Sequence, residues 1–115
     1  MDKRLKADKL TLGTCYYPEH WPEELWADDI RRMLDNGITV IRIAEFAWNK
    51  FEPEEGVFDF TFFDHFLDVA EKTDIKVIFC TPTATPPAWL TEKISRDPKC
   101  FQRRYTDETW PAQAL

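Results

Sequence analysis

The 115-residue sequence has material for one ordinary domain, which excludes a second folded domain. Its 15 Lys and Arg face 21 Asp and Glu, so the formal net charge is −6, the wrong sign for a protein that binds the phosphate backbone of nucleic acid. Hydrophobic residues make up 43% and aromatic residues 15% of the chain, which excludes disorder by composition.

No apolar run approaches the roughly 20 residues that a membrane-spanning helix needs. The first ten residues carry basic side chains and lack the apolar centre of a secretory signal. We therefore expect a soluble, cytoplasmic protein without a membrane partner, in which residues 1–10 form a basic tail. The cysteines include no Cys-x-x-Cys pair, so we expect no metal site and plain buried or partly buried thiols at Cys15, Cys80 and Cys100.

The first part of the chain predicts a strand, a helix and a second strand. Residues 12–16 are a short run of mainly apolar, β-branched and aromatic side chains, which is typical of a buried strand. Apolar residues from Leu25 to Leu34 recur at helical spacing, which predicts a helix that begins after Pro22 and ends at Asn36-Gly37. Residues 38–43 predict the second buried strand.

The chain then predicts a second helix, a third strand and a short helix. An apolar stripe from Phe62 to Ala70 predicts the helix, and its start resembles a capping box formed by Thr61 and Asp64. Residues 75–80 predict a third buried strand, and a short helix is expected at residues 88–90. From residue 95 to residue 115 no regular period is visible, and no fourth strand is predicted.

The alternation of strands and helices predicts an α/β fold with parallel strands, because each helix carries the chain back across the sheet. The spacing of the strand starts is close to the roughly 31 residues that one unit of an eight-stranded (β/α) barrel occupies. A doubly wound open sheet has similar units, so both architectures are open at this point. In either architecture the long strand-to-helix connections meet at the carboxyl ends of the strands, where we expect the functional site.

Carboxylates and large rings stand together in these connections. Indole faces stack on the apolar faces of sugar rings, and paired carboxylates divide acid and nucleophile duties in glycoside hydrolysis. From residue types alone, Glu19 and Glu45 are the candidate catalytic pair. Arg42, near the end of a buried strand, must face a partner anion or a wet cavity. The full set of candidates is Glu19, His20 and Trp21 after the first strand and Arg42, Glu45 and Trp48 at the end of the second.

Several residues also fit structural roles. Trp26 and the phenylalanines of the second helix are expected in the core, because they lie on a helix face that must cover the sheet. His20 fits a hydrogen-bonded rim residue better than a metal ligand, since no Cys or second His lies near it in sequence. Trp21 and Trp48 could equally well pack at the rim of the site or form a surface on which a ligand stacks. A solvated acidic loop is expected at Glu52, Glu54 and Glu55.

Four blocks of the sequence, in order and spacing, resemble the start of the glycoside hydrolase family 42 β-galactosidases. They are residues 16–21 (YYPEHW), 41–48 (IRIAEFAW), 52–60 (EPEEGVFDF) and 81–90 (TPTATPPAWL). The resemblance makes residues 11–111 the N-terminal portion of the family's catalytic domain and leaves residues 112–115 outside the family pattern. It implies a (β/α)8 TIM barrel of which this chain holds the first three βα units, retention of configuration, and terminal β-D-galactosides as substrates.

The resemblance also changes the roles of the candidate residues. In the family the acid/base glutamate follows the fourth strand and the nucleophile follows the seventh, so both are expected beyond Leu115 and no residue of this chain is expected to be catalytic. Arg42 matches the arginine that hydrogen-bonds the nucleophile in related barrel glycosidases. Cys100 does not match the zinc cysteines of some members, and we expect no cofactor. The resemblance leaves Arg42, Glu45, Trp48, Glu19, His20 and Trp21 as rim or supporting residues.

We therefore expect a fragment of a retaining β-galactosidase, encoded by a shortened or frame-disrupted gene and inactive by itself. It is expected to fold poorly alone, because an incomplete barrel leaves strand edges and apolar surface open. Two alternatives remain: a non-catalytic module that binds galactosides, and a fragment that completes a separately encoded barrel. For the intact parent the resemblance implies a homo-oligomer, usually a trimer.

Overall fold

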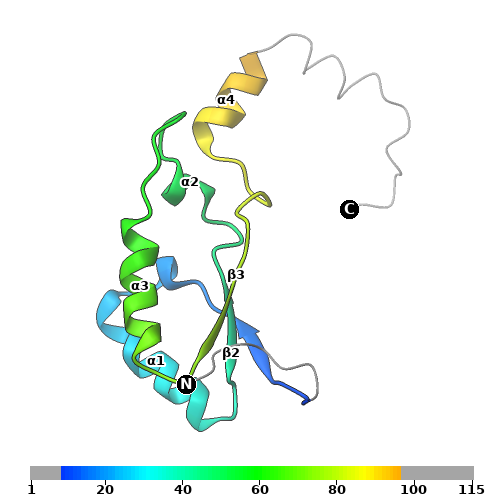
Figure 1. Cartoon of the computed structure of the whole chain (residues 1–115). Coiled ribbons are helices and arrows are strands. Elements are labelled where there is room, and N and C mark those ends of the chain that lie inside the picture. Colours follow the sequence, from blue (N-terminus) through cyan, green and yellow to red (C-terminus); the bar gives the residue numbers. More distant parts are fainter. Residues whose placement is uncertain (1–8, 97–115) are drawn as a thin grey trace, which may run out of the picture.

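The computed structural model describes residues 9–96, and its centre is a parallel sheet of three short strands (Figure 1). The strands are β1 (Gly13–Cys15), β2 (Val40–Ile43) and β3 (Lys76–Phe79), in the order β1-β2-β3. Gly13 pairs with Val40, and Val40 pairs with Lys76. The parallel pairing and the strand order confirm the sequence-based prediction. Predictions for residues 1–8 and 97–115, including Cys100, the absence of a fourth strand and the tail at 112–115, lie outside the described residues.

Helix α1 (Glu23–Asp35) connects β1 to β2, and its ends follow the predicted signals. Pro22 precedes the first turn, which carries two acidic residues that favour a helix N-terminus. At the other end the backbone and side-chain N–H groups of Asn36 donate to the carbonyl of Arg32 at 3.2 and 2.7 Å. Gly37 then adopts a φ of +80°, a conformation that glycine enters without a Cβ penalty.

Helix α3 (Thr61–Glu71) connects β2 to β3, but the predicted capping box is wrong. Thr61 lies inside the helix as its first residue, and the N-cap residue Phe60 makes no side-chain capping bond. The carboxylate of Asp59 instead accepts a hydrogen bond from the backbone N–H of Thr61 at 2.9 Å. The first turn of α3 is therefore capped by the side chain of Asp59, two residues before Thr61, and not by the side chain of Thr61.

The core lies between α1, α3 and one face of the sheet. Trp26 of α1 contacts Phe66 of α3 edge to face at 5.3 Å between ring centroids, so both helices cover the same face. Ile41 and Ile43 of β2 alternate toward this core and are fully buried. The prediction that Trp26 is a core residue is confirmed, as it is for the phenylalanines of α3, of which Phe63 and Phe66 are buried and Phe62 is half-buried.

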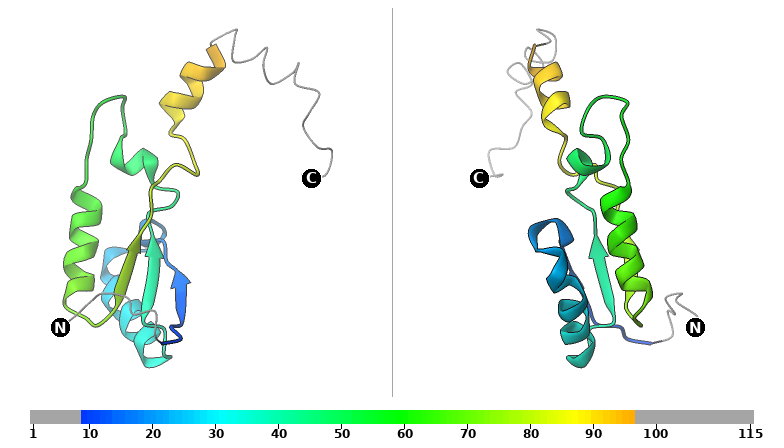
Figure 2. Two further views of the ribbon diagram at one scale, coloured as in Figure 1. Left: turned by 45° about the vertical axis from the view of Figure 1, so that its right-hand side comes forward. Right: turned by 90° about the vertical axis from the view of Figure 1, so that its left-hand side faces the viewer.

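Only the middle strand is buried as predicted. All residues of β1 are exposed, and in β3 Ile78 and Phe79 are 41% and 46% exposed. The prediction of three buried strands is therefore wrong for β1 and β3. Each of these two strands has a neighbour on one side only within residues 9–96, and both helices lie on a single face, so the opposite face of the sheet is open (Figure 2).

Three helical elements lie at the carboxyl ends of the strands, and sequence periodicity did not indicate the first two. The 3-10 helix η1 (Pro18–His20) follows β1, and helix α2 (Trp48–Phe51) follows β2. Helix α4 (Ala88–Arg96) follows β3 and extends the short helix predicted there (Figure 1). In the part of the chain that the structure describes, no helix is long and apolar enough to cross a membrane.

Candidate functional site

Arg42 is the central cation at the carboxyl end of the sheet. It is the third residue of β2, and the alternation along the strand directs its side chain to the open face, opposite Ile41 and Ile43. Its Nη2 forms an ion pair with Oε1 of Glu45, and its Nε donates to Sγ of Cys80 at 3.1 Å. The hydrogen bond to Cys80 and the charge of Glu45 raise the pKa of Arg42 above its ordinary value. Of the two surroundings expected for Arg42, a partner anion or a wet cavity, the structure shows the partner anion, Glu45.

The backbone between Arg42 and Glu45 is strained. Ala44 has a φ of 73°, which is rare for a residue with a Cβ, and its side chain is fully buried. This left-handed residue directly follows β2 and turns the chain so that the side chain of Glu45 reaches that of Arg42. Strain of this kind is retained only where the surrounding packing over-determines the conformation, and it is commonly found at functional sites.

Tyr17 joins the first connection to the second. Its ring lies 5.4 Å from that of His20 and 5.7 Å from that of Phe46, between centroids. Desolvation raises the pKa of Tyr17, and Cys15 and Glu45 raise it further, whereas Arg42 opposes them. Sequence reasoning did not select Tyr17 as a site residue, although its place directly after the first strand was the available signal.

The residues predicted after β1 take different positions. Glu19 is half-buried, and its Oε2 is buried without a hydrogen-bond partner among residues 9–96. His20 and Trp21 are exposed and line a groove of about 650 Å³ that runs along α1 and also includes Cys15 and Tyr17. The indole N–H of Trp26 fixes this connection by donating to the carbonyl of Pro18 at 3.1 Å.

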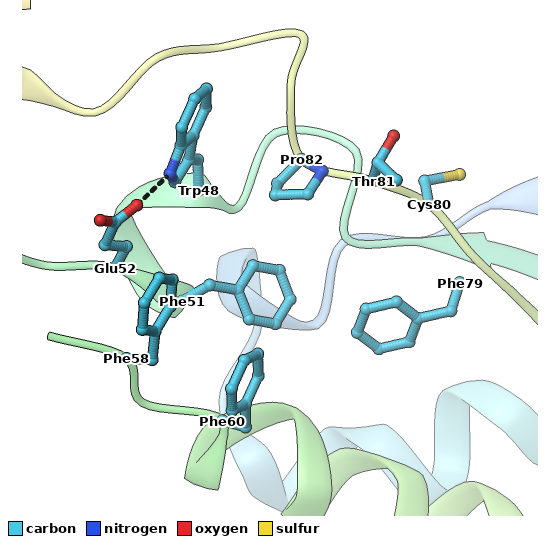
Figure 3. A pocket seen from close by; sticks show the side chains of 9 residues that line it. All are labelled: Trp48, Phe51, Glu52, Phe58, Phe60, Phe79, Cys80, Thr81 and Pro82. Carbon is cyan, nitrogen blue, oxygen red and sulfur yellow. Dashed lines mark hydrogen bonds between the residues drawn. The ribbon is translucent and has the colours of Figure 1, made fainter. Parts of the chain in front are cut away.

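Trp48 lies in a separate, aromatic pocket of about 330 Å³ between α2, the loop after it and the end of β3 (Figure 3). The indole N–H of Trp48 donates to Oε2 of Glu52 at 2.8 Å, and the backbone N–H of Gly56 donates to Oε1 of the same carboxylate at 2.8 Å. These two donors lower the pKa of Glu52, with Gly56 making the larger contribution. The pocket is lined by Trp48, Phe51, Glu52, Phe58, Phe60, Phe79, Cys80, Thr81 and Pro82.

The sequence-based predictions for Glu52 and Cys15 are wrong. Glu52 is only 8% exposed, so it does not belong to a solvated acidic loop, whereas Glu54 and Glu55 are exposed as predicted. The signal for Glu52 was its spacing of one helical turn from Trp48. Cys15 is exposed rather than buried, because it lies on the open face of the edge strand, and Cys80 is half-buried.

The structure thus places five of the six candidates in three groups, and the sixth, Glu19, lies in η1 outside them. Arg42 and Glu45 form an ion pair at the centre, His20 and Trp21 share the groove beside α1, and Trp48 lies in the aromatic pocket. Glu45 is engaged by Arg42, which fits a supporting carboxylate better than one of a reacting pair. Within residues 9–96, no group of three or more His, Cys, Asp or Glu residues could hold a metal ion.

Comparison with known proteins gives the family. Residues 15–107 match the family model described as Beta-galactosidase, Glyco_hydro_42. The chain is 48% identical over 84 residues to beta-galactosidase BgaH of Haloferax lucentense, a match that covers 73% of this chain and 13% of the relative. It is also 48% identical over 82 residues to a beta-galactosidase of Thermus thermophilus, covering 71% of this chain and 13% of the relative.

Solved structures agree with the sequence matches. The beta-galactosidase of Halorubrum lacusprofundi has a TM-score of 0.67 at 45% identity, and the match covers 73% of this chain and 13% of that one. The beta-galactosidase of Bacillus circulans has a TM-score of 0.71 at 31% identity, covering 76% and 13%. The three parallel strands and their helices are therefore the first βα units of a TIM barrel, as predicted. Although it spans only about 13% of the length of these relatives, the chain belongs to the glycoside hydrolase family 42 β-galactosidases.

Proposed function

We propose that residues 11–111 form the N-terminal portion of the catalytic domain of a retaining β-galactosidase that hydrolyses terminal non-reducing β-D-galactosyl residues. The observation that carries this proposal is the family match over residues 15–107, which includes the ion pair of Arg42 and Glu45 at the end of β2. For the whole protein we also propose a cytoplasmic homo-oligomer, with three copies as the expected state, and a reaction that needs no cofactor.

The described residues supply one wall of the proposed sugar site. Arg42 offers a permanently charged guanidinium on the open face of the sheet, held by Glu45 and Cys80, and such a preorganised cation can fix a carboxylate contributed by a later strand. Trp21 and Trp48 offer indole faces for stacking on pyranose rings, and the proposal includes Glu19 and His20 as rim residues. No role in the sugar site is proposed for residues 112–115.

We also propose that the 115-residue chain is not catalytic by itself. Glycoside hydrolysis with retention needs two carboxyl groups about 5–5.5 Å apart, one of which must be free to attack the sugar. Glu45 is held by Arg42, and the buried Oε2 of Glu19 has no hydrogen-bond donor in the described part of the chain. A buried carboxylate oxygen requires a donor, and the rest of the barrel is the expected source.

A complementation assay tests this function. The purified chain is incubated with a chromogenic β-galactoside alone, and is also co-produced with the remaining barrel of a relative such as the Thermus thermophilus enzyme. We expect no turnover by the chain alone and turnover in the complemented form. Arg42→Ala should abolish the complemented activity, whereas Arg31→Ala, an exposed arginine of α1, should preserve it as the matched control.

The outcome separates the proposal from its alternatives. Turnover by the isolated chain that is lost in Glu45→Gln would return Glu45 to the catalytic pair and contradict the proposal. A chain that binds galactosides without any complemented turnover would favour a binding module, which the half-exposed Trp21 could serve. Trp fluorescence during a galactoside titration reports that binding, with the Trp21→Phe variant as the control.

A further inference from the structure

Glu52 is the one buried charged residue among residues 9–96, and all three of its oxygens accept hydrogen bonds. Oε2 accepts from Nε1 of Trp48, Oε1 accepts from the backbone N–H of Gly56, and the backbone carbonyl accepts from Nε1 of Trp89, each at 2.8 Å. The three donors come from α2, from the loop after it and from α4. One residue therefore connects three segments beyond the carboxyl ends of β2 and β3.

Hydrogen bonds compensate for the burial of the charged carboxylate of Glu52. Burying a carboxylate costs free energy unless hydrogen bonds compensate for the lost water, and here each carboxylate oxygen has an N–H donor. Hydrogen bonds to an ionised acceptor are shorter and stronger than those between neutral groups, which agrees with the 2.8 Å distances. The indole of Trp48 cannot rotate about its side-chain bonds without breaking its hydrogen bond to Glu52. The carboxylate therefore fixes the direction of the indole.

Other contacts hold the same three segments together. The loop after α2 is closed by an isolated bridge between Glu54 and Val57, with Gly56 at a φ of +78° between them. Lys93 of α4 donates to the carboxylate of Glu55 at 2.6 Å, which adds a second connection between α4 and this loop. Glu52 lies at the centre of these contacts, and its side chain lines the aromatic pocket beside Trp48 (Figure 3).

We propose that Glu52 is a positioning residue, whose ionised carboxylate holds the indole of Trp48 and the Gly56 turn in place while its backbone carbonyl anchors Trp89 of α4. The part of this proposal that concerns substrate rests on the proposed function, because Trp48 is a candidate platform for the sugar. The positioning itself depends only on the contacts given above. Sequence analysis placed Glu52 in a solvated loop, so this role comes from the structure alone.

The proposal predicts a pH dependence of the Trp48 indole. The hydrogen bonds from Gly56 and Trp48 lower the pKa of Glu52, so the carboxylate is charged at neutral pH and becomes protonated only below the pH at which exposed glutamates titrate. The bond to Trp48 is therefore present at neutral pH and is lost as the pH falls through this lowered pKa. The charged or titratable groups on the segments packed against Glu52 are Lys50, Glu54, Glu55, Asp59, Cys80, Glu92, Lys93 and Arg96.

Nitrogen-15 NMR of the labelled 115-residue chain tests the proposal through its indole N–H signals. We expect the Trp48 signal to shift between pH 7 and pH 3 with a midpoint below 4.5, the ordinary pKa of a glutamate. The Trp89 signal is an internal control that should move less, because its acceptor is a backbone carbonyl. Trp48→Phe and Trp89→Phe assign the two signals.

Two substitutions show whether Glu52 causes the pH dependence of the Trp48 signal. Glu52→Gln should abolish the titration of the Trp48 signal and increase the exchange rate of its indole proton with solvent, since a neutral amide has only one acceptor oxygen for two donors. Glu54→Gln, an exposed carboxylate of the same loop, should leave both observations unchanged. If Glu52→Gln does not fold, the pH titration of the unmodified chain decides the matter.

The proposal is overturned if the Trp48 signal does not titrate, if it titrates equally in Glu52→Gln, or if all indole signals stay at the position of an unfolded chain. None of these measurements involves a sugar. A failed complementation assay with a normal Trp48 titration would contradict the proposed function and leave the positioning role of Glu52 intact.

Discussion

The hydroxyl of Tyr16 donates a 2.9 Å hydrogen bond to Oδ2 of Asp29 and so connects the end of β1 to the middle of α1. The ring of Tyr16 also stacks on Phe66 of α3 at 5.8 Å between centroids. Burial and the Asp29 carboxylate both raise the pKa of Tyr16, with burial making the larger contribution, so the hydroxyl is a donor at neutral pH. One side chain thus joins an edge strand to both helices.

Tyr16→Phe removes this hydrogen bond and keeps the ring stack. We expect it to lower the free energy of unfolding by about 1 kcal/mol, because a partly buried bond to a carboxylate is lost and Asp29 can recover water. Urea denaturation at low protein concentration measures the change. Asp29→Asn keeps an acceptor and should cost less, so equal or greater destabilisation by Asp29→Asn would contradict this account.

Substitutions at Ala44 test the strain after β2. Ala44→Gly relieves the cost of a positive φ but adds the conformational entropy of glycine, so we expect stability within about 1 kcal/mol of the unmodified chain. Ala44→Val places a β-branched side chain in a buried position at this φ and should cost more than about 2 kcal/mol. Thermal unfolding of both variants measures the difference. A valine variant as stable as the glycine variant would show that the conformation is unstrained.

Acid should destabilise the protein through Glu52 and Asp59. N–H donors from Gly56 and Trp48 lower the pKa of Glu52, and the N–H of Thr61 lowers that of Asp59, below their ordinary values of 4.5 and 3.8. Because the folded-state pKa values are lowered, the unfolded chain binds more protons, and this stabilisation is complete above the ordinary values and is lost as the pH falls through the lowered ones.

Urea midpoints at pH 7, 5, 4 and 3 check this dependence. The midpoint should change little between pH 7 and 5 and fall from pH 5 toward pH 3. Glu52→Gln should flatten that fall, and Glu54→Gln should reproduce the curve of the unmodified chain. A midpoint that is constant or rises toward pH 3 would contradict the assignment.

The open face of the sheet should make the isolated chain self-associate. Ile78 pairs with Arg42 in register and lies on this face, where it is 41% exposed, and β1 and β3 present edges without a partner strand in the described part of the chain. Ile78→Asp should therefore shift the chain toward the monomer in size-exclusion chromatography with light scattering. It should leave the circular dichroism spectrum unchanged.

Val77→Asp is the matched control for that experiment. Val77 is the neighbouring residue of the same strand, but it packs against the core under the helices. A charge there should unfold the chain rather than disperse it, because Val77 is half-buried against the core and a carboxylate facing that apolar core without a partner is costly. Equal effects of the two substitutions on solubility and on helix content would show that the two faces of β3 are not distinguished as described.

The order of elements could be predicted because each carries a local signal. The stripe from Leu25 to Leu34 between Pro22 and Asn36 determines α1, and the parallel pairing follows from helices that return the chain across the sheet. The cap of α3 could not be predicted in the same way, because Asp59 and Thr61 both offered a side-chain oxygen to the first turn, and only the path of the chain decides that Asp59 accepts from the N–H of Thr61.

The sequence by itself determined the family, the parallel α/β units and the presence of Arg42, Glu45 and Trp48 near the carboxyl ends of the strands, since these depend on residue type and spacing along the chain. Tertiary structure decided that Glu45 forms an ion pair with Arg42, that Cys80, directly after β3, accepts a hydrogen bond from the same Arg42, and that Glu52 is buried between Trp48 and Gly56. The physical reason is that burial and hydrogen bonding depend on neighbours from other segments, which a local pattern does not contain.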